Sequence, residues 1–170
     1  CVYPQELKNE LLTHFETIPC FDIPRFRNSY EIAKEIKKEA LSKEEVINHC
    51  YDSTEKHVAL MRYLLEHKEW DLFFGVIGLT DRMNHLFWKY VDKQHRAYDP
   101  LSPYIYTLKD FYIFIDKKIG ELLKILDKDT TIIILSDHGI KRLHTRVNVT
   151  DWLINEGYMV LKNPVKEILS

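Results

Sequence analysis

The 170-residue sequence lacks the features that mark disulfide-rich, zinc-ribbon and membrane-spanning proteins. Its three cysteines, Cys1, Cys20 and Cys50, are widely spaced and form no C-x-x-C pair, which argues against a zinc ribbon, a thioredoxin-type motif or a disulfide scaffold. The simplest interpretation is a cytoplasmic protein with reduced cysteines. No apolar run is long enough to span a bilayer, and the first ten residues do not resemble a signal peptide.

A strong charge of either sign is also missing. The chain has 24 Lys and Arg against 26 Asp and Glu, a formal net charge of -2, so composition gives no electrostatic reason to expect nucleic acid or an anionic membrane as a partner. Apolar residues, in contrast, make up 45% of the sequence. A chain of this length and composition can bury the core of one domain, which excludes wholesale disorder.

Helical periodicity marks five segments: residues 7–15, 31–40, 42–65, 108–126 and a last one from Val149 to near Gly157. The third begins with the capping-box pattern of Ser42 and Glu45, after which apolar residues recur along one face. In the fourth, the apolar positions expected to face the core are Phe111, Tyr112, Ile115, Ile119, Leu122, Leu123 and Leu126.

Two continuous apolar runs predict buried strands. Residues 71–79 (DLFFGVIGL) and 131–135 (TIIIL) have strand length and are apolar almost throughout, which suits strands covered on both faces of a sheet. A short final strand is expected at 158–161. Helices alternating with strands predict an α/β fold with parallel strands. We expect a helix-rich cap or connecting segment at 1–68 and part of an α/β domain at 69–170.

An aspartate and a histidine follow each predicted strand. Asp81 and His85 are four residues apart, so both side chains point the same way if a helical turn follows. Asp137 and His138 are adjacent and precede a glycine. Because ligands of open α/β sheets bind beyond the carboxyl ends of the strands, the two pairs are expected to converge. Carboxylate and imidazole ligands suit zinc, and also manganese or iron.

A structural explanation of the same residues stays open on the local pattern. A single aspartate after a strand commonly caps the next helix, and a single histidine is more often structural than a metal ligand. Two Asp–His pairs, each at the end of a buried strand, are harder to explain in this way. Two metal ions held there could clamp an in-line displacement at phosphorus, one activating the nucleophile and the other neutralising the leaving oxygen.

Four stretches in order, DLFFGVIGLTDRMNHLFWKY, HRAYDP, TTIIILSDHGI and VNVTDWLINEGYMVLK, resemble the type I phosphodiesterase/nucleotide pyrophosphatase family of the alkaline phosphatase superfamily. The resemblance implies an alkaline-phosphatase-like, mostly parallel sheet flanked by helices, and a phosphate-ester small molecule as substrate. It matches Asp81 and His85 to two ligands of one metal ion, and Asp137 and His138 to two ligands of a second. The two ions implied are divalent, with zinc expected first.

The sequence departs from the family pattern at the nucleophile. The family's pattern includes an upstream strand with an aspartate, followed by a Thr or Ser that attacks phosphorus, and no such strand is evident before Trp70. His144 could be an additional ligand, contact substrate or be a solvated loop residue. The other helical histidines are expected to be exposed; they are His14, His49, His57 and His67. His95 is expected to make a structural hydrogen bond.

We therefore expect the central segment of a larger metal-dependent phosphoric-ester hydrolase, inactive by itself, with its Thr or Ser nucleophile outside these 170 residues. The alternative is a non-catalytic metal-binding or structural domain that kept the fold without the nucleophile. A related enzyme class, the sulfatases, fits less well, because Cys1 begins CVYPQ, which misses the Pro and Arg positions of the sulfatase motif.

Overall fold

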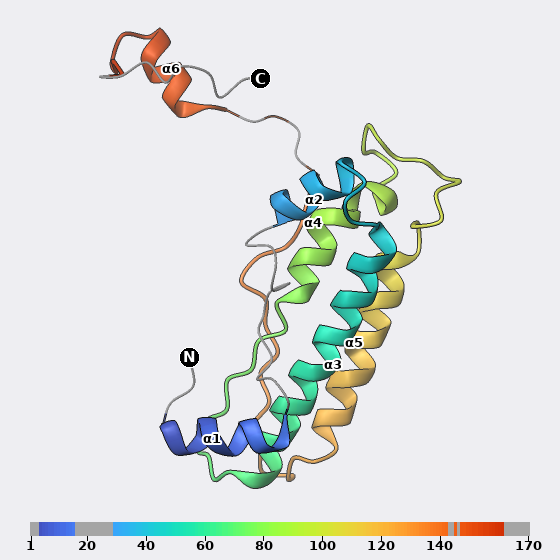
Figure 1. The fold of residues 1–170 in the computed structure, drawn as a ribbon, viewed down its shortest axis with the longest axis vertical. Coiled ribbons are helices and arrows are strands. Elements are labelled where there is room, and N and C mark those ends of the chain that lie inside the picture. Colours follow the sequence, from blue (N-terminus) through green and yellow to red (C-terminus); the bar gives the residue numbers. More distant parts are fainter. Residues whose placement is uncertain (1–3, 16–28, 143–144, 146, 162–170) are drawn as a thin grey trace. The chain divides into compact units, whose positions relative to one another are not determined.

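The structure of the chain, a computed structural model, describes residues 4–15, 29–142, 145 and 147–161. It divides into two compact units, Cys1–Ile140 and Lys141–Ser170 (Figure 1). The helices are α1 (Gln5–His14), α2 (Ser29–Lys37), α3 (Lys43–His67), α4 (Leu79–Val91), α5 (Thr107–Leu123) and α6 (Val149–Asn155).

The longest helix, α3, confirms the predicted start and buried face. The Ser42 hydroxyl accepts a hydrogen bond from the Glu45 backbone N–H at 3.1 Å, and the Glu45 carboxylate accepts one from the Ser42 N–H at 2.7 Å. This reciprocal capping box satisfies two backbone donors that a helix start otherwise leaves unpaired. The buried residues recur at helical spacing along the side that packs inward: Val46, Cys50, Ser53, Thr54, His57, Val58 and Met61.

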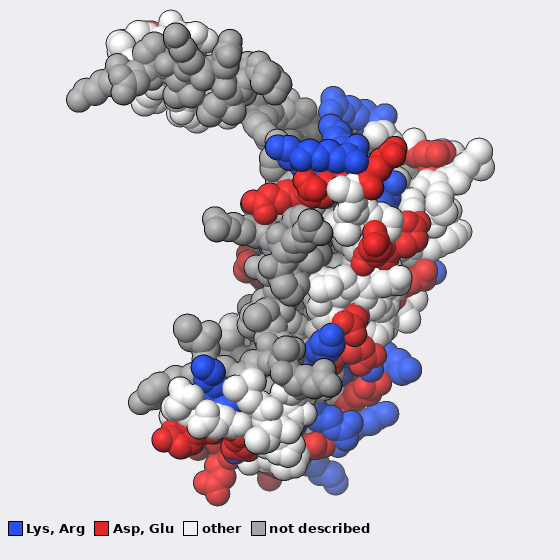
Figure 2. Space-filling view, viewed as in Figure 1, with Lys and Arg blue, Asp and Glu red and all other residues white. Residues whose placement is uncertain are grey.

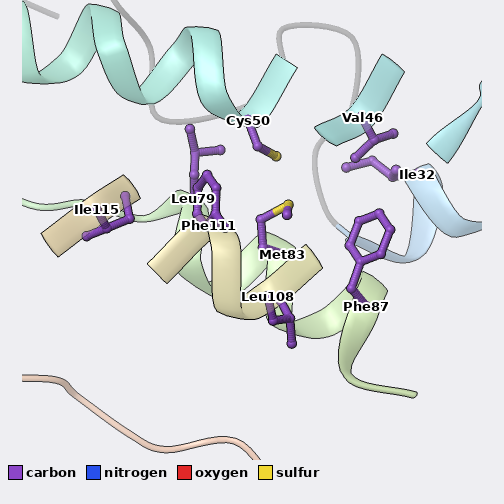
Figure 3. Packing of buried hydrophobic residues seen from close by; sticks show 9 residues of the cluster. All are labelled: Ile32, Val46, Cys50, Leu79, Met83, Phe87, Leu108, Phe111 and Ile115. Atoms are coloured by element: carbon purple, nitrogen blue, oxygen red, sulfur yellow. The ribbon is translucent and has the colours of Figure 1, made fainter. Parts of the chain in front are cut away.

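The core of the first unit is built by four helices. Helices α3 and α5 run side by side, and α4 packs against α2, α3 and α5 (Figure 1). Nine side chains from these helices converge (Figure 3), namely Ile32, Val46, Cys50, Leu79, Met83, Phe87, Leu108, Phe111 and Ile115. Tyr51 of α3 adds an edge-to-face contact to Phe111 of α5, with ring centroids 5.1 Å apart. Burial also raises the pKa of the Cys50 thiol to about 12, so this cysteine stays protonated and packs as a small apolar residue.

Helix α4 is not among the helical segments predicted from the sequence, which considered only a helical turn after Asp81. Leu79, which the apolar run placed in a strand, is the first residue of the helix. Its side chain is buried together with those of Met83 and Phe87, one turn apart, and this i, i+4, i+8 series forms the core-facing stripe of α4. The start at Leu79 has a consequence for the site, because it puts Asp81 in the first helical turn.

The two predicted strand segments are non-helical, and within the described residues no strand is assigned. Residues 72–77 and 131–135 appear in Figure 1 as irregular traces. Their apolar side chains are largely open to solvent, with Leu72 85% exposed and Ile133 76% exposed. The parallel sheet and the division of the chain at residue 68 therefore stay predictions.

The second unit contains α6, as predicted. The Asn148 side chain caps the helix by accepting a hydrogen bond from the Asp151 N–H at 3.3 Å. Gly157 ends the segment with a φ of 76°, a left-handed conformation that glycine adopts without steric penalty. The rings of Trp152 and Tyr158 pack with centroids 6.4 Å apart.

Charges are mixed on the surface of the chain. Acidic and basic side chains are interspersed over the face shown in Figure 2, and several form helical ion pairs such as Lys56–Asp52 at 2.7 Å and Arg62–Glu66 at 3.0 Å. This agrees with the near balance of charge in the sequence. Each helix in the described part of the chain is too short or too polar to cross a membrane.

Candidate active site

The first turn of α4 positions one Asp–His pair. Asp81 and His85 are one helical turn apart, and the Asp81 carboxylate Oδ1 lies 3.3 Å from His85 Nε2. Both side chains are about half exposed, at 45% and 51%, so their polar atoms are accessible. The geometry confirms the expectation that a helical turn points the two side chains the same way.

The second pair lies on the loop that follows residues 131–135. The Asp137 carboxylate accepts a hydrogen bond from the His138 backbone N–H at 3.1 Å, and its Oδ2 lies 3.7 Å from His138 Nε2. His138 Nδ1 donates to the Gly139 carbonyl at 2.9 Å, while the Ser136 hydroxyl donates to the His138 carbonyl at 2.5 Å. These local bonds fix the orientation of the loop and of the imidazole.

Asp81 of the first pair and both residues of the second pair line one small cavity of the first unit, whereas His85 is not among its lining residues. The volume of the cavity is about 100 Å³, and its lining consists of Thr80, Asp81, Asn84, Tyr112, Ser136, Asp137, His138, Gly139 and Ile140. The pKa of His138 is raised, first by the hydrogen bond to the Gly139 carbonyl and then by the negative charges of Asp137 and Asp81. The contribution of Asp81, 57 positions away in the sequence, agrees with the shared cavity.

The Asp and His side chains are suitable metal ligands, but each pair alone provides too few of them for one ion. His138 donates from Nδ1 to the Gly139 carbonyl, and a metal-bound histidine commonly makes such a hydrogen bond with one ring nitrogen while the other, here Nε2, binds the ion. Carboxylate oxygen and imidazole nitrogen are donors suited to zinc. However, among the residues that the structure describes, no group of three or more His, Cys, Asp or Glu is arranged to hold one ion. Each pair thus offers two donors, fewer than the three protein ligands of a catalytic zinc site.

Two residues of the cavity were missed by the sequence pattern. Asn84 is buried at 6% exposure, and its Nδ2 donates to the Thr80 carbonyl at 2.9 Å and to the Tyr112 hydroxyl at 2.7 Å. Tyr112 was expected on the buried face of its helix but is 46% exposed. The phenol is amphipathic, so helical spacing alone treats it as apolar and overlooks its polar end.

His57 and His95 lie away from the cavity. His144 is not among the described residues. His95 makes the expected structural hydrogen bond, accepting from the Ala97 N–H at Nδ1 over 3.1 Å. The prediction that His57 is exposed is wrong: it is buried on α3, with Nδ1 donating to the Ser53 carbonyl at 2.8 Å. Burial of this imidazole lowers its pKa despite that hydrogen bond.

Comparison with known proteins gives one match. A sequence model of the type I phosphodiesterase / nucleotide pyrophosphatase family matches residues 10–169. The chain belongs to this family. The match includes most of the helical first third, further toward the N-terminus than the motif resemblance from about Trp70 reached. Neither the search of curated proteins nor the search of solved structures produced a match.

Membership places the chain among phosphoric-ester hydrolases of the phosphodiesterase type. The family is generally metal-dependent and acts on small-molecule phosphate esters. This confirms the resemblance on which the functional prediction was based.

Proposed function

We propose that the protein is a metal-dependent phosphodiesterase or nucleotide pyrophosphatase-like hydrolase whose two Asp–His pairs contribute to a two-metal centre. The observation that carries this proposal is that Asp81 and the Asp137–His138 pair line one cavity although they come from distant parts of the sequence. Two separate structural Asp–His contacts would have no reason to share a cavity. Convergence of this kind is the arrangement expected of a binding site assembled by the fold.

In this proposal each pair supplies two ligands to one ion. Asp81 would bind through its carboxylate and His85 through Nε2, while Asp137 and His138 would do the same for the second ion. Zinc suits these donors best, and manganese and iron are also compatible. When bound, the ions supply Lewis-acid stabilisation of charge on the phosphoryl oxygens. The chain itself holds the donors in place through the Ser136 and Gly139 contacts of the loop.

The nucleophile in this proposal is a Thr or Ser from outside these 170 residues. Two aliphatic hydroxyls line the cavity, but both donate to backbone carbonyls, Thr80 to Ile77 at 3.0 Å and Ser136 to His138 at 2.5 Å. Each of these hydroxyls donates its hydrogen to the backbone rather than to a base that would activate it. The remaining metal ligands are proposed to come from the same additional sequence.

The same view assigns residues 71–79 and 131–135 to the parallel sheet of an alkaline-phosphatase-like fold. Their exposed apolar side chains support this assignment, because an unpaired apolar segment has both unsatisfied backbone groups and uncovered side chains. Adjacent strands and covering helices would satisfy both. The Asp81 and Asp137 side chains would then lie at the carboxyl edge of that sheet.

The experiment compares metal content and hydrolysis in the full-length protein. We expect Asp81→Ala and Asp137→Ala each to lose bound metal and to lower kcat/KM for a chromogenic phosphodiester by more than about 100-fold, since even changes in residues behind the ligands lower activity 10- to 100-fold. Asp52→Ala is the matched control, because Asp52 is exposed on α3, outside the cavity, and forms an ion pair with Lys56. Unchanged metal content and hydrolysis in both site variants would refute the proposal, whereas bound metal without hydrolysis in the wild type would favour a non-catalytic domain.

A further inference from the structure

A buried amide and a phenol form a polar pair in the wall of the cavity. Asn84 comes from α4 and precedes His85, and Tyr112 comes from α5. Their side chains meet at 2.7 Å, with Asn84 Nδ2 as the donor. Neither residue is one of the proposed metal ligands, yet both line the cavity with Asp81 and Asp137.

The hydrogen-bond chemistry determines the direction of this contact. The Thr80 carbonyl, 2.9 Å from Asn84, can only accept, so it must face the NH2 side of the amide. Because the same nitrogen contacts the tyrosine, the Tyr112 oxygen acts as an acceptor there. The phenol hydrogen is therefore not used toward Asn84, and no second partner for the hydroxyl occurs among the described residues.

The other side of the amide is also informative. Asn84 Oδ1 is buried and has no hydrogen-bond partner within the described part of the chain. An unpaired buried acceptor is unfavourable and uncommon in native proteins. Asn84 nonetheless uses both amide hydrogens to hold the Tyr112 oxygen and the α4 backbone. Such a residue is better explained by the orientation it gives its neighbour than by its own stability.

We propose that Tyr112 is a substrate-binding residue that donates its O–H to a non-bridging oxygen of the phosphoryl group, and that Asn84 is its positioning residue. This inference rests on the proposed function. The Tyr112 side chain lines the same cavity, of about 100 Å³, as the Asp81 and Asp137 carboxylates, next to which the phosphoryl group would bind in the proposed function. Hydrogen bonds to an anionic oxygen are stronger than neutral ones, so a single oriented phenol contributes measurably to affinity.

The main test removes the hydroxyl alone, in the full-length protein. We expect Tyr112→Phe to lower kcat/KM for a chromogenic phosphodiester by about 10- to 100-fold, the effect of losing one hydrogen bond to a charged group. It should also weaken the binding of inorganic phosphate, measured calorimetrically, by about tenfold or more. Tyr106→Phe is the matched control, because Tyr106 is an exposed tyrosine next to the start of α5 and outside the cavity.

A second variant tests the positioning role. Asn84→Asp keeps the side-chain shape but replaces the donor with a carboxylate, which would accept the Tyr112 O–H and withdraw it from the substrate. We expect a loss in kcat/KM and in phosphate affinity similar to that of Tyr112→Phe. The double variant should be no worse than the poorer single variant, because the two residues act through one hydrogen bond.

The outcomes separate this inference from the proposed function. If the wild type neither binds metal nor hydrolyses phosphodiesters, the proposed function itself fails. If the wild type is active but Tyr112→Phe leaves kcat/KM and phosphate affinity unchanged, only the inference is overturned. A fall in kcat/KM with unchanged phosphate affinity would also overturn it, because the hydroxyl would then not contact the phosphoryl group. Additive losses in the double variant would contradict the role of Asn84.

Discussion

The helical core and the two apolar segments of the first unit have similar composition but opposite surroundings. The nine core residues of α2–α5 are at most 6% exposed, whereas Leu72, Phe74, Ile133 and Leu135 are each more than 70% exposed. The difference arises from the hydrogen bonds that each structure needs. A helix satisfies its backbone within its own segment, while a strand needs a neighbouring strand. Helices of this chain can therefore form from local sequence, whereas each apolar run needs a paired strand before it can join a sheet.

The largest effect is expected in the helical core. Phe111 is fully buried and contacts Tyr51 edge-to-face, so Phe111→Ala should lower the free energy of unfolding by about 3–5 kcal/mol. Chemical denaturation monitored by circular dichroism measures the change. A loss below about 1 kcal/mol would mean that α3, α4 and α5 do not share a packed core.

A smaller, pH-dependent effect is expected from His57, also in the helical part. Burial lowers the pKa of its imidazole below the ordinary value, so folding favours the neutral form. The stabilisation is complete above about pH 6.5, the ordinary histidine value, and is lost as pH falls through the lowered pKa. Thermal melts between pH 7 and 5 should show that wild type loses more stability than His57→Gln. Equal pH dependence in the two proteins would contradict this role.

The capping box of α3 tests how local the helical signal is. Ser42→Ala removes the acceptor for the Glu45 N–H and should lower the free energy of unfolding by about 1 kcal/mol. Ser42→Thr is the control, because threonine keeps a hydroxyl that can cap the helix. If alanine and threonine behaved alike, the start of α3 would depend on packing rather than on the cap.

The smallest effect is expected in the apolar segments, with the same substitution as in the core. Phe74 is 78% exposed, so Phe74→Ala should change the free energy of unfolding of this chain by no more than about 0.5 kcal/mol. The measurement is the same denaturation experiment as for Phe111→Ala. A loss of several kcal/mol would contradict the difference between the core and the apolar segments, because it would mean that residues 71–79 are already covered.

The same contrast explains how much could be predicted. The start of α3, its buried face and the end of α6 at Gly157 follow from capping chemistry and periodicity, which are local. The start of α4 at Leu79 was missed because a continuous apolar run does not distinguish a strand from a buried helix turn. His57 was expected to be exposed because histidine is a polar residue. The packing of α3 against its neighbours buries it.

The candidate site likewise contains residues that the sequence reveals and residues that only the structure reveals. The Asp81–His85 spacing and the Asp137–His138 motif are short patterns that the sequence makes visible. Their convergence was predicted from a parallel sheet, and in the structure Asp81, Asp137 and His138 line one cavity. Asn84 and Tyr112 are 28 positions apart and meet only because α4 packs against α5. No pattern in a single sequence marks such a pair, so the structure was needed to find it.

The kinetic coupling between Asp81 and Asp137 shows whether the two motifs serve one site. In the full-length protein, kcat/KM for a chromogenic phosphodiester is compared among Asp81→Ala, Asp137→Ala and the double variant. If both residues serve one centre, each single variant loses most activity and the double variant is about as impaired as the poorer single one. Losses that multiply, or a single variant with wild-type activity, would contradict the claim that these two motifs form one site.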